Sequence, residues 1–179
     1  MNQPALILIL GGARSGKSSF AEKLAASYHQ DVLFIATAEA RDAEMAARIA
    51  KHQADRPVAW QTLEEPCAIA QALQQLSPPP IIILDCVNLW VTNLLLKYET
   101  EEKAFAELNA LFAWFQTHQS TLILVSNEVG LGIVPVDQLS RTFRDWLGTF
   151  NQQIAAQATE VYLMVAGLPL EIKRLATKC

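Results

Sequence analysis

The sequence predicts a three-layer α/β fold, in which a mainly parallel sheet lies between layers of helices. Short, almost continuously apolar runs recur along the chain, as expected for strands buried on both faces of a parallel sheet. Longer stretches with helical spacing separate these runs, and a glycine-rich segment joins the first run to the first helical stretch. This alternation is typical of βαβ units, whose crossover helices cover the sheet.

The first expected strand is residues 5–10. This run is too short to span a membrane, no Lys or Arg precedes it, and two glycines follow it, so we interpret it as a buried strand. An amphipathic helix is expected over 17–28 and a second strand over 32–36. Good helix formers occupy about 40–53, and a weaker strand is expected over 58–62.

Proline and glycine residues separate the later elements. A helix expected over 67–76 ends at the Ser-Pro-Pro-Pro segment 77–80, immediately before a strand over 81–84. The remaining helices are expected over 91–97, 101–118 and 140–157, and the remaining strands over 121–126 and 161–166.

Length and composition limit the classes of function. The 179 residues contain no repeat, low-complexity segment or long linker, so a single domain covering 1–179 is expected. The formal net charge of -4 argues against broad binding of nucleic acid, although a local cluster of donors can still hold a phosphate. Three cysteines without CxxC spacing, and the lack of an export signal or anchor, predict a cytoplasmic protein without membrane insertion.

The glycine-rich segment has the GxxxxGK(S/T) pattern of a phosphate-binding loop, or P-loop. It reads Gly11-Gly12-Ala13-Arg14-Ser15-Gly16-Lys17-Ser18. The bare pattern also arises by chance, but here it lies between a strand and a helix, which is the context that the motif requires. Backbone N–H groups and the helix N-terminus would surround the phosphates, with Lys17 on the terminal phosphates and Ser18 on Mg²⁺. The segment predicts a P-loop nucleotide-binding transferase domain of the RecA-like type.

A magnesium site also needs a carboxylate, and Asp85 follows the apolar run 81–84. An acid at the end of a buried strand is typical of the Walker-B carboxylate, which orients Mg²⁺ or its water. The alternative is that Asp85 only begins a turn. No Asn-Lys-x-Asp stands near a strand end, so the guanine-reading motif of the switch GTPases is absent, and a small-molecule transferase is favoured over a switch.

A second group of candidates lies on the helix expected over 40–53. Arg48, Lys51 and His52 fall on one face at helical spacing. Like charge from the two cations favours a neutral imidazole, which is a usable nucleophile, and the same cations would attract a nucleotide phosphate. From the residues alone, a solvated helix face with a surface histidine is the simpler interpretation, and both interpretations remain open.

Many segments match a known family in the same order. Besides the P-loop, they are 35–38, 44–49, His52, 56–57, 60–64, 85–86, 90–95, 126–135, 141–145 and 148–152. In these segments the chain resembles the bifunctional adenosylcobinamide kinase / adenosylcobinamide-phosphate guanylyltransferase family of cobalamin biosynthesis. The resemblance covers nearly the whole chain and is far more specific than a P-loop alone.

The resemblance implies two reactions. ATP or GTP first phosphorylates the aminopropanol hydroxyl of adenosylcobinamide. GTP then transfers GMP to a histidine with release of pyrophosphate, and the nucleotidyl group passes to adenosylcobinamide phosphate, giving adenosylcobinamide-GDP. The guanylylated histidine of the family corresponds to His52. The implied divalent metal is Mg²⁺, with Mn²⁺ as the alternative, and the implied assembly is a homo-oligomer, in particular a trimer.

The resemblance also implies the site residues. His52 and Lys17 are the expected catalytic residues, and Ser18 and Asp85 are the expected metal ligands. The expected nucleotide-binding residues are Gly11, Gly12, Ala13, Arg14, Ser15, Gly16, Lys17, Ser18, Ala36, Thr37, Ala38, Gln53, Ala54, Asp55, Arg56, Glu64 and Asp85. Glu64 is suited to accept hydrogen bonds from a guanine edge or from a ribose.

Two positions depart from some relatives. Lys51-His52 stands where some relatives have His-His. If the nucleophile of the family is the first of these two residues, Lys51 would have to take its role here, or guanylyl transfer would be lost. Asp85 stands where some carry Glu, which keeps the charge but changes the geometry towards a metal. If His52 lies far from the P-loop, its helix must move or GTP must bind in a second orientation.

Two other functions remain as alternatives. An ordinary small-molecule kinase would transfer a phosphoryl group without forming a covalent nucleotide. A nucleotide sensor or assembly protein would bind GTP without turnover when cobinamide is supplied. The nucleotide preference of the kinase step, and whether one site serves both reactions, are left open by the sequence.

Overall fold

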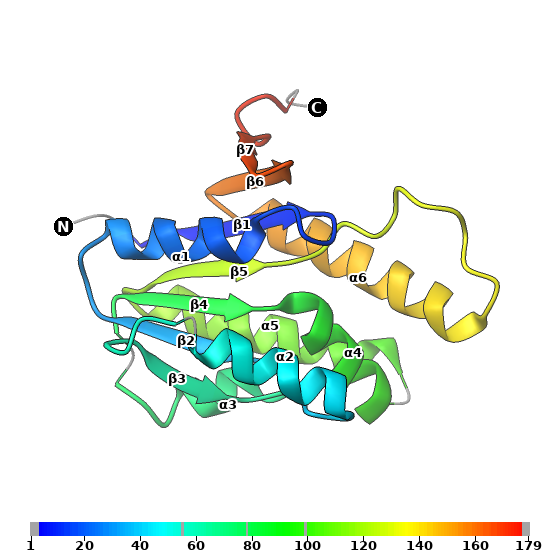
Figure 1. The fold of residues 1–179 in the computed structure, drawn as a ribbon, viewed down its shortest axis with the longest axis horizontal. Helices are drawn as coiled ribbons and strands as arrows, with labels where there is room; N and C mark the ends of the chain where they lie inside the picture. Colours follow the sequence, from blue (N-terminus) through cyan, green and yellow to red (C-terminus); the bar gives the residue numbers. More distant parts are fainter. Residues whose placement is uncertain (1–3, 55, 78, 99, 177–179) are drawn as a thin grey trace.

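The computed structural model describes residues 4–54, 56–77, 79–98 and 100–176. Within these residues, seven strands form one sheet (Figure 1). They are β1 (Leu6–Gly11), β2 (Val32–Ala36), β3 (Gln61–Glu64), β4 (Ile81–Asp85), β5 (Thr121–Val125), β6 (Glu160–Val165) and β7 (Leu168–Glu171). Their order is β3-β2-β4-β5-β1-β6-β7. Every neighbouring pair is parallel except β6 and β7, so the predicted mainly parallel sheet is confirmed.

Helices cover both faces of this sheet. In the described part of the chain they are α1 (Lys17–Ser27), α2 (Ala43–Ala54), α3 (Ile69–Leu73), α4 (Val87–Lys97), α5 (Glu101–Thr117) and α6 (Gln138–Gln157). Figure 1 shows α1 in front of the strands and α5 behind them. The three-layer α/β architecture expected from the sequence is therefore confirmed.

The alternation of side chains along the strands divides the core in two. Ile7 and Ile9 of β1 pack with Ala21 and Ala25 of α1 on one face. Leu6 and its alternate neighbours along β1 pack on the other face with buried side chains of α3, α4, α5 and α6. Burying one such Leu or Ile side chain contributes about 1.5–3 kcal/mol, so the two layers of helices hold the sheet rigidly.

The strand order also determines the type of P-loop fold. Strand β5 lies between β1, which leads into the P-loop, and β4, which ends at Asp85. This is the RecA-like arrangement that the sequence predicts.

The element boundaries agree with the sequence in most places. The five strong strands match to within one residue, whereas α3 is shorter than expected and α4 begins at Val87 rather than at 91. The weak strand expected over 58–62 is displaced to Gln61–Glu64, because a turn closed by the Trp60 N–H and the Pro57 carbonyl oxygen (3.0 Å) precedes it. Strand β7 was not expected, since its exposed Leu-Pro-Leu-Glu sequence lacks the apolar run of a buried strand.

Parallel pairing aligns the ends of the strands at one edge of the sheet. Ala36 at the end of β2 is in register with Glu64 of β3 on one side and with Asp85 of β4 on the other. The P-loop leaves β1 at the same edge. Ligands of open α/β sheets bind at the carboxyl ends of the strands, so this edge is the expected location of a site.

The length of the helices and the state of two cysteines can also be compared with the sequence. In the ranges that the structure covers, no helix is both long and apolar enough to cross a bilayer. Cys67 and Cys86 are not joined in a disulfide, and Cys179 lies outside the described residues.

Candidate nucleotide-binding and group-transfer site

The P-loop connects β1 to α1 in a tight turn that needs two glycines. A Cβ atom on Gly11 would lie 2.7 Å from the carbonyl oxygen of Met164 in β6. Gly16 immediately precedes α1 with a left-handed φ of 94°, a conformation that glycine adopts without steric cost. The backbone therefore turns directly into the N-terminus of α1, where partial positive charge favours anions.

Lys17 lies inside this turn. Its side chain is 8% exposed, and Nζ donates to the carbonyl oxygen of Gly12 at 2.6 Å. Burial lowers the pKa of Lys17, and this effect outweighs the opposing influence of the nearby Cys86 and Asp85 side chains, which raises it. A desolvated ammonium gains most from an anionic partner, so a phosphate oxygen is a better acceptor for Lys17 than the Gly12 carbonyl.

Asp85, at the carboxyl end of β4, is influenced electrostatically by several neighbouring side chains. Burial raises the pKa of its carboxyl group well above the usual range. A hydrogen bond from Ser18 opposes this effect and lowers the pKa, as do the nearby side chains of His52, Arg56 and Lys17. Groups from the P-loop, from α2 and from the segment after α2 therefore all act on one carboxylate.

Two hydrogen-bond donors near this edge are buried without a partner. They are Oγ of Ser15 in the P-loop and Nε of Arg56. The Arg56 guanidinium lies 3.9 Å above the ring of Phe34 in β2, and burial lowers its pKa. Buried donors without partners are costly, so both atoms fit a site whose ligand carries anionic oxygens.

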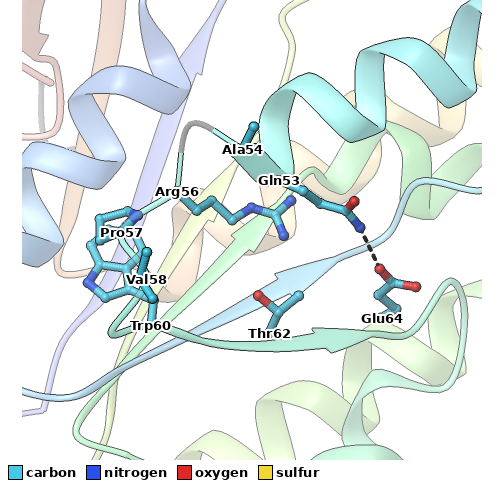
Figure 2. Close-up of a pocket in the computed structure, with 8 residues that line it drawn as sticks. All are labelled: Gln53, Ala54, Arg56, Pro57, Val58, Trp60, Thr62 and Glu64. Atoms are coloured by element: carbon cyan, nitrogen blue, oxygen red, sulfur yellow. Dashed lines mark hydrogen bonds between the residues drawn. The ribbon is translucent and has the colours of Figure 1, made fainter.

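A cleft of about 520 Å³ opens beside Arg56, between the end of α2 and strand β3. Its lining residues are Gln53, Ala54, Arg56, Pro57, Val58, Trp60, Thr62 and Glu64 (Figure 2). Nε2 of Gln53 donates to Oε1 of Glu64 at 2.8 Å, and Figure 2 shows this pair closing one end of the cleft. An aromatic ring, a guanidinium and a carboxylate around one opening suit a nucleobase with its ribose and phosphate.

The other predicted residues lie around the same edge. Ala36 and Thr37 are buried and Ala38 is half-buried, so this segment offers mainly its backbone. His52, on the last turn of α2, is exposed and close enough to Asp85 to influence its ionisation. Asp55 and the side chain of Arg48 lie outside what the structure describes.

The cleft also contains residues that the sequence analysis missed, namely Pro57, Val58, Trp60 and Thr62. A signal for two of them was present, because Trp60 and Thr62 precede Glu64 at strand spacing and would share its face. The sequence gives no such signal for Pro57 and Val58, which lie in the turn before β3.

Known proteins resemble the chain over nearly its whole length. Residues 7–172 match the family model CobU, cobinamide kinase / cobinamide phosphate guanyltransferase. The bifunctional adenosylcobalamin biosynthesis protein CobP of Pseudomonas aeruginosa is 47% identical over 167 residues, which are 93% of this chain and 96% of that protein. The CobU proteins of the same description from Escherichia coli K12 and Salmonella typhimurium LT2 are each 42% identical, covering 94% of this chain and 99% of theirs.

A solved structure from Pyrococcus horikoshii OT3 shares the fold. Its TM-score is 0.59 at 8% sequence identity, and the match covers 96% of this chain and 87% of that one. At such low identity the likeness supports only the architecture. The family match and the full-length relatives decide the family, and they confirm the resemblance inferred from the sequence: the chain belongs to the CobU family of cobinamide kinases / cobinamide phosphate guanyltransferases.

Proposed function

We propose that this single-domain protein carries out both reactions of its family on adenosylcobinamide. One observation carries the proposal: the cleft beside Arg56 runs along β3 to Glu64 at its carboxyl end, which is the edge of the sheet where the P-loop lies and where Asp85 and His52 are close to each other. A phosphate-binding turn alone would suit any P-loop kinase. The cleft beside a helix that presents a histidine is the feature that favours a nucleotidyl transfer as well.

In the kinase reaction, the hydroxyl oxygen of the aminopropanol arm attacks the γ-phosphorus of ATP or GTP. The bond between that phosphorus and the β–γ bridging oxygen breaks, the hydroxyl proton is released, and the nucleoside diphosphate leaves. Lys17 and the backbone N–H groups of the P-loop would stabilise the charge on the transferred phosphoryl group. The burial of Lys17 strengthens this contribution, because the charge acts at low local dielectric.

The proposed metal is Mg²⁺, which would neutralise phosphate charge when bound. Ser18 and Asp85 already share a hydrogen bond, and both offer oxygen atoms, which Mg²⁺ prefers. Among the described residues no cluster of three or more His, Cys, Asp or Glu side chains could hold a metal by itself. This fits Mg²⁺, which binds one or two protein oxygens and completes its shell with phosphates and water.

In the guanylyl transfer, a ring nitrogen of neutral His52 attacks the α-phosphorus of GTP. The bond to the α–β bridging oxygen breaks, and pyrophosphate leaves from the P-loop. A phosphate oxygen of adenosylcobinamide phosphate then attacks the same phosphorus, the P–N bond breaks, and His52 recovers its electron pair. The two in-line steps replace one more difficult transfer.

The cleft would hold the guanosine. Both Glu64 and Trp60 line it, so Glu64 would accept hydrogen bonds from the guanine edge and Trp60 would offer an aromatic face. Arg56 would bind the α-phosphate. In this orientation one GTP molecule would reach from the cleft to the P-loop, so that one site would serve both reactions.

The last two proposals concern the movement of α2 and the assembly of the protein. Because most α2 side chains are exposed, this helix would be able to move and bring His52 closer to the phosphates when GTP binds. The protein would act in the cytoplasm as a homo-oligomer, a trimer by resemblance to its family.

The test uses GTP labelled at the α-phosphate, with Mg²⁺ present. Wild type is expected to retain acid-labile label after denaturation, and His52→Ala to retain none. His29→Asn is the matched control, because His29 is also exposed at a helix end and its left-handed φ of 53° suits Asn. No label on wild type would exclude the covalent mechanism, and label on His52→Ala would assign the nucleophile to another residue.

A further inference from the structure

Asn93 is a buried polar residue of α4 whose amide contacts the connection between β2 and α2 at two points and the segment between β3 and α3 at a third. Its side chain is 5% exposed. Nδ2 donates to the carbonyl oxygens of Thr37 at 2.7 Å and of Pro66 at 3.1 Å, and Oδ1 accepts from Nη2 of Arg41 at 3.0 Å. Carbonyls only accept and a guanidinium only donates, so these partners allow one orientation of the amide. Both N–H donors and the oxygen of the amide are therefore used.

The first partner of Asn93 leads to the carboxylate at the centre of the site. Thr37 is fully buried, and its Oγ1 both donates to the carbonyl oxygen of Cys86 at 2.8 Å and accepts from the Cys86 N–H at 3.0 Å. Cys86 follows Asp85 directly. The chain of hydrogen bonds from Asn93 through Thr37 thus fixes the end of β2 against the end of β4.

The third partner of Asn93 leads to the helix that carries His52. Arg41 immediately precedes Asp42, whose Oδ1 accepts from the N–H of Met45 at 2.7 Å at the start of α2. This side-chain bond is typical of a residue that caps a helix N-terminus. The contact of Arg41 with Asn93 therefore attaches the first turn of α2 to the buried network, whereas His52 lies on the last turn.

Arg41 has a second partner that provides a control. It forms an ion pair with Glu39 at 2.6 Å, and both side chains are nearly half exposed. Exposed ion pairs of this kind contribute little to stability. The contact with Asn93 is different, because one of its two partners is buried and has no solvent with which to replace the lost donor.

We propose that Arg41 and Asn93 are positioning residues for guanylyl transfer: their hydrogen bond sets the position of α2, and through it the approach of His52 to the α-phosphate. The inference rests on the proposed function, since it assumes that His52 is the nucleophile. Neither residue is expected to touch a substrate. Phosphoryl transfer from ATP does not use His52, so it does not depend on this contact.

The experiment compares Arg41→Ala with Glu39→Ala, which removes the ion pair and leaves the contact with Asn93. Two quantities are measured: the rate constant for labelling of His52 at saturating GTP, and the rate of adenosylcobinamide phosphorylation by ATP. We expect Arg41→Ala to lower the labelling rate constant by about tenfold or more, because misplacing a nucleophile by about 1 Å has effects of this size. The KM for GTP in labelling and the phosphorylation rate should stay within twofold of wild type. Glu39→Ala should match wild type in both reactions.

A double-mutant cycle tests whether Arg41 acts through Asn93. In an Asn93→Ala background, adding Arg41→Ala should have no further effect on labelling. If Asn93→Ala does not fold, the comparison of Arg41→Ala with Glu39→Ala still tests whether the Arg41 contact is needed for labelling. Equal loss of both reactions in Arg41→Ala, or unchanged labelling, would overturn the inference. Absence of label on wild type would instead refute the proposed function itself, so the two failures are distinguishable.

Discussion

The backbone N–H of Gly167, in the turn between β6 and β7, donates to the carbonyl oxygen of Ser15 in the P-loop at 3.0 Å. Ala166 and Gly167 both have positive φ, 51° and 83°, which is typical of a tight hairpin turn. The turn packs directly on the backbone of Gly16, where a Cβ atom would lie 3.3 Å from the Cα of Gly167. A hairpin near the end of the described chain thereby supports the phosphate-binding turn near its beginning.

This packing predicts that Gly16→Ala destabilises the protein whereas Gly12→Ala does not. At Gly16 the left-handed φ and the close Gly167 backbone both oppose a side chain, with a cost of about 1–3 kcal/mol. At Gly12 a Cβ atom would have no neighbour within 4 Å. Thermal unfolding without nucleotide should give a Tm several degrees lower for Gly16→Ala. Equal Tm values for the two variants would show that the hairpin does not constrain the loop.

Asp85→Asn is expected to raise stability while it lowers activity. The pKa of Asp85 in the folded protein lies above its usual value, so the ionised carboxylate costs free energy in the fold at neutral pH. Removing the charge should raise the Tm at pH 7. This gain should shrink as the pH falls through the folded pKa towards the ordinary value of 3.8, because wild type then becomes neutral as well. Activity should fall roughly 10- to 100-fold or more, since a proposed metal ligand is lost.

The measurement for Asp85→Asn is a series of melting curves between pH 7 and pH 4, with phosphorylation assayed in parallel. Lower Tm than wild type at pH 7 would contradict the sign of the pKa shift. A rise in Tm with unchanged activity would remove Asp85 from the catalytic site.

Trp60 should report GTP binding through its fluorescence. It is half-buried in the lining of the cleft, whereas the other tryptophans are buried in the core at 0%, 3% and 7% exposure (Trp90, Trp114 and Trp146). Guanine stacked near the indole should change its emission and protect it from acrylamide. Trp60→Phe should abolish both changes while the core emission confirms the fold. A GTP response that survives in Trp60→Phe would place the base elsewhere.

Glu64→Gln should weaken the use of GTP in labelling without affecting phosphorylation by ATP. A carboxylate accepts from both N–H groups of the guanine edge, whereas an amide presents one donor and one acceptor group. Losing a hydrogen bond to a charged group costs about 1.5–3 kcal/mol, so kcat/KM for GTP should fall by roughly 10- to 100-fold. Competition with inosine triphosphate separates the two N–H groups. Equal losses with GTP and ATP would mean that Glu64 acts on the fold rather than on the base.

The sequence predicts most of this fold because its strongest signals are local. Short, continuous apolar runs such as 32–36 are typical of strands buried on both faces, and the P-loop glycines require a turn between strand and helix. The displaced strand β3 and the unexpected strand β7 are exposed at the edges of the sheet. Their positions depend on pairing with β2 and β6, which no local pattern encodes.

For the site, the sequence by itself determined the family and the P-loop motif, and through the resemblance it implied a set of candidate site residues. It could not determine which of these residues meet, because Lys17, Glu64 and Asp85 are far apart in the chain. Their proximity follows from parallel pairing, which aligns the carboxyl ends of the strands at one edge.

Only the tertiary structure decided that a cleft lies beside Arg56 and that Asn93 joins Arg41 to Thr37. Residue 93 lies 52 positions from Arg41 and 56 from Thr37, and in the sequence it is one of several polar residues in a mainly apolar helix. Its role appears only when α4 packs on the sheet. Burial then removes water from the amide, and each of its donors and its acceptor must find a protein partner.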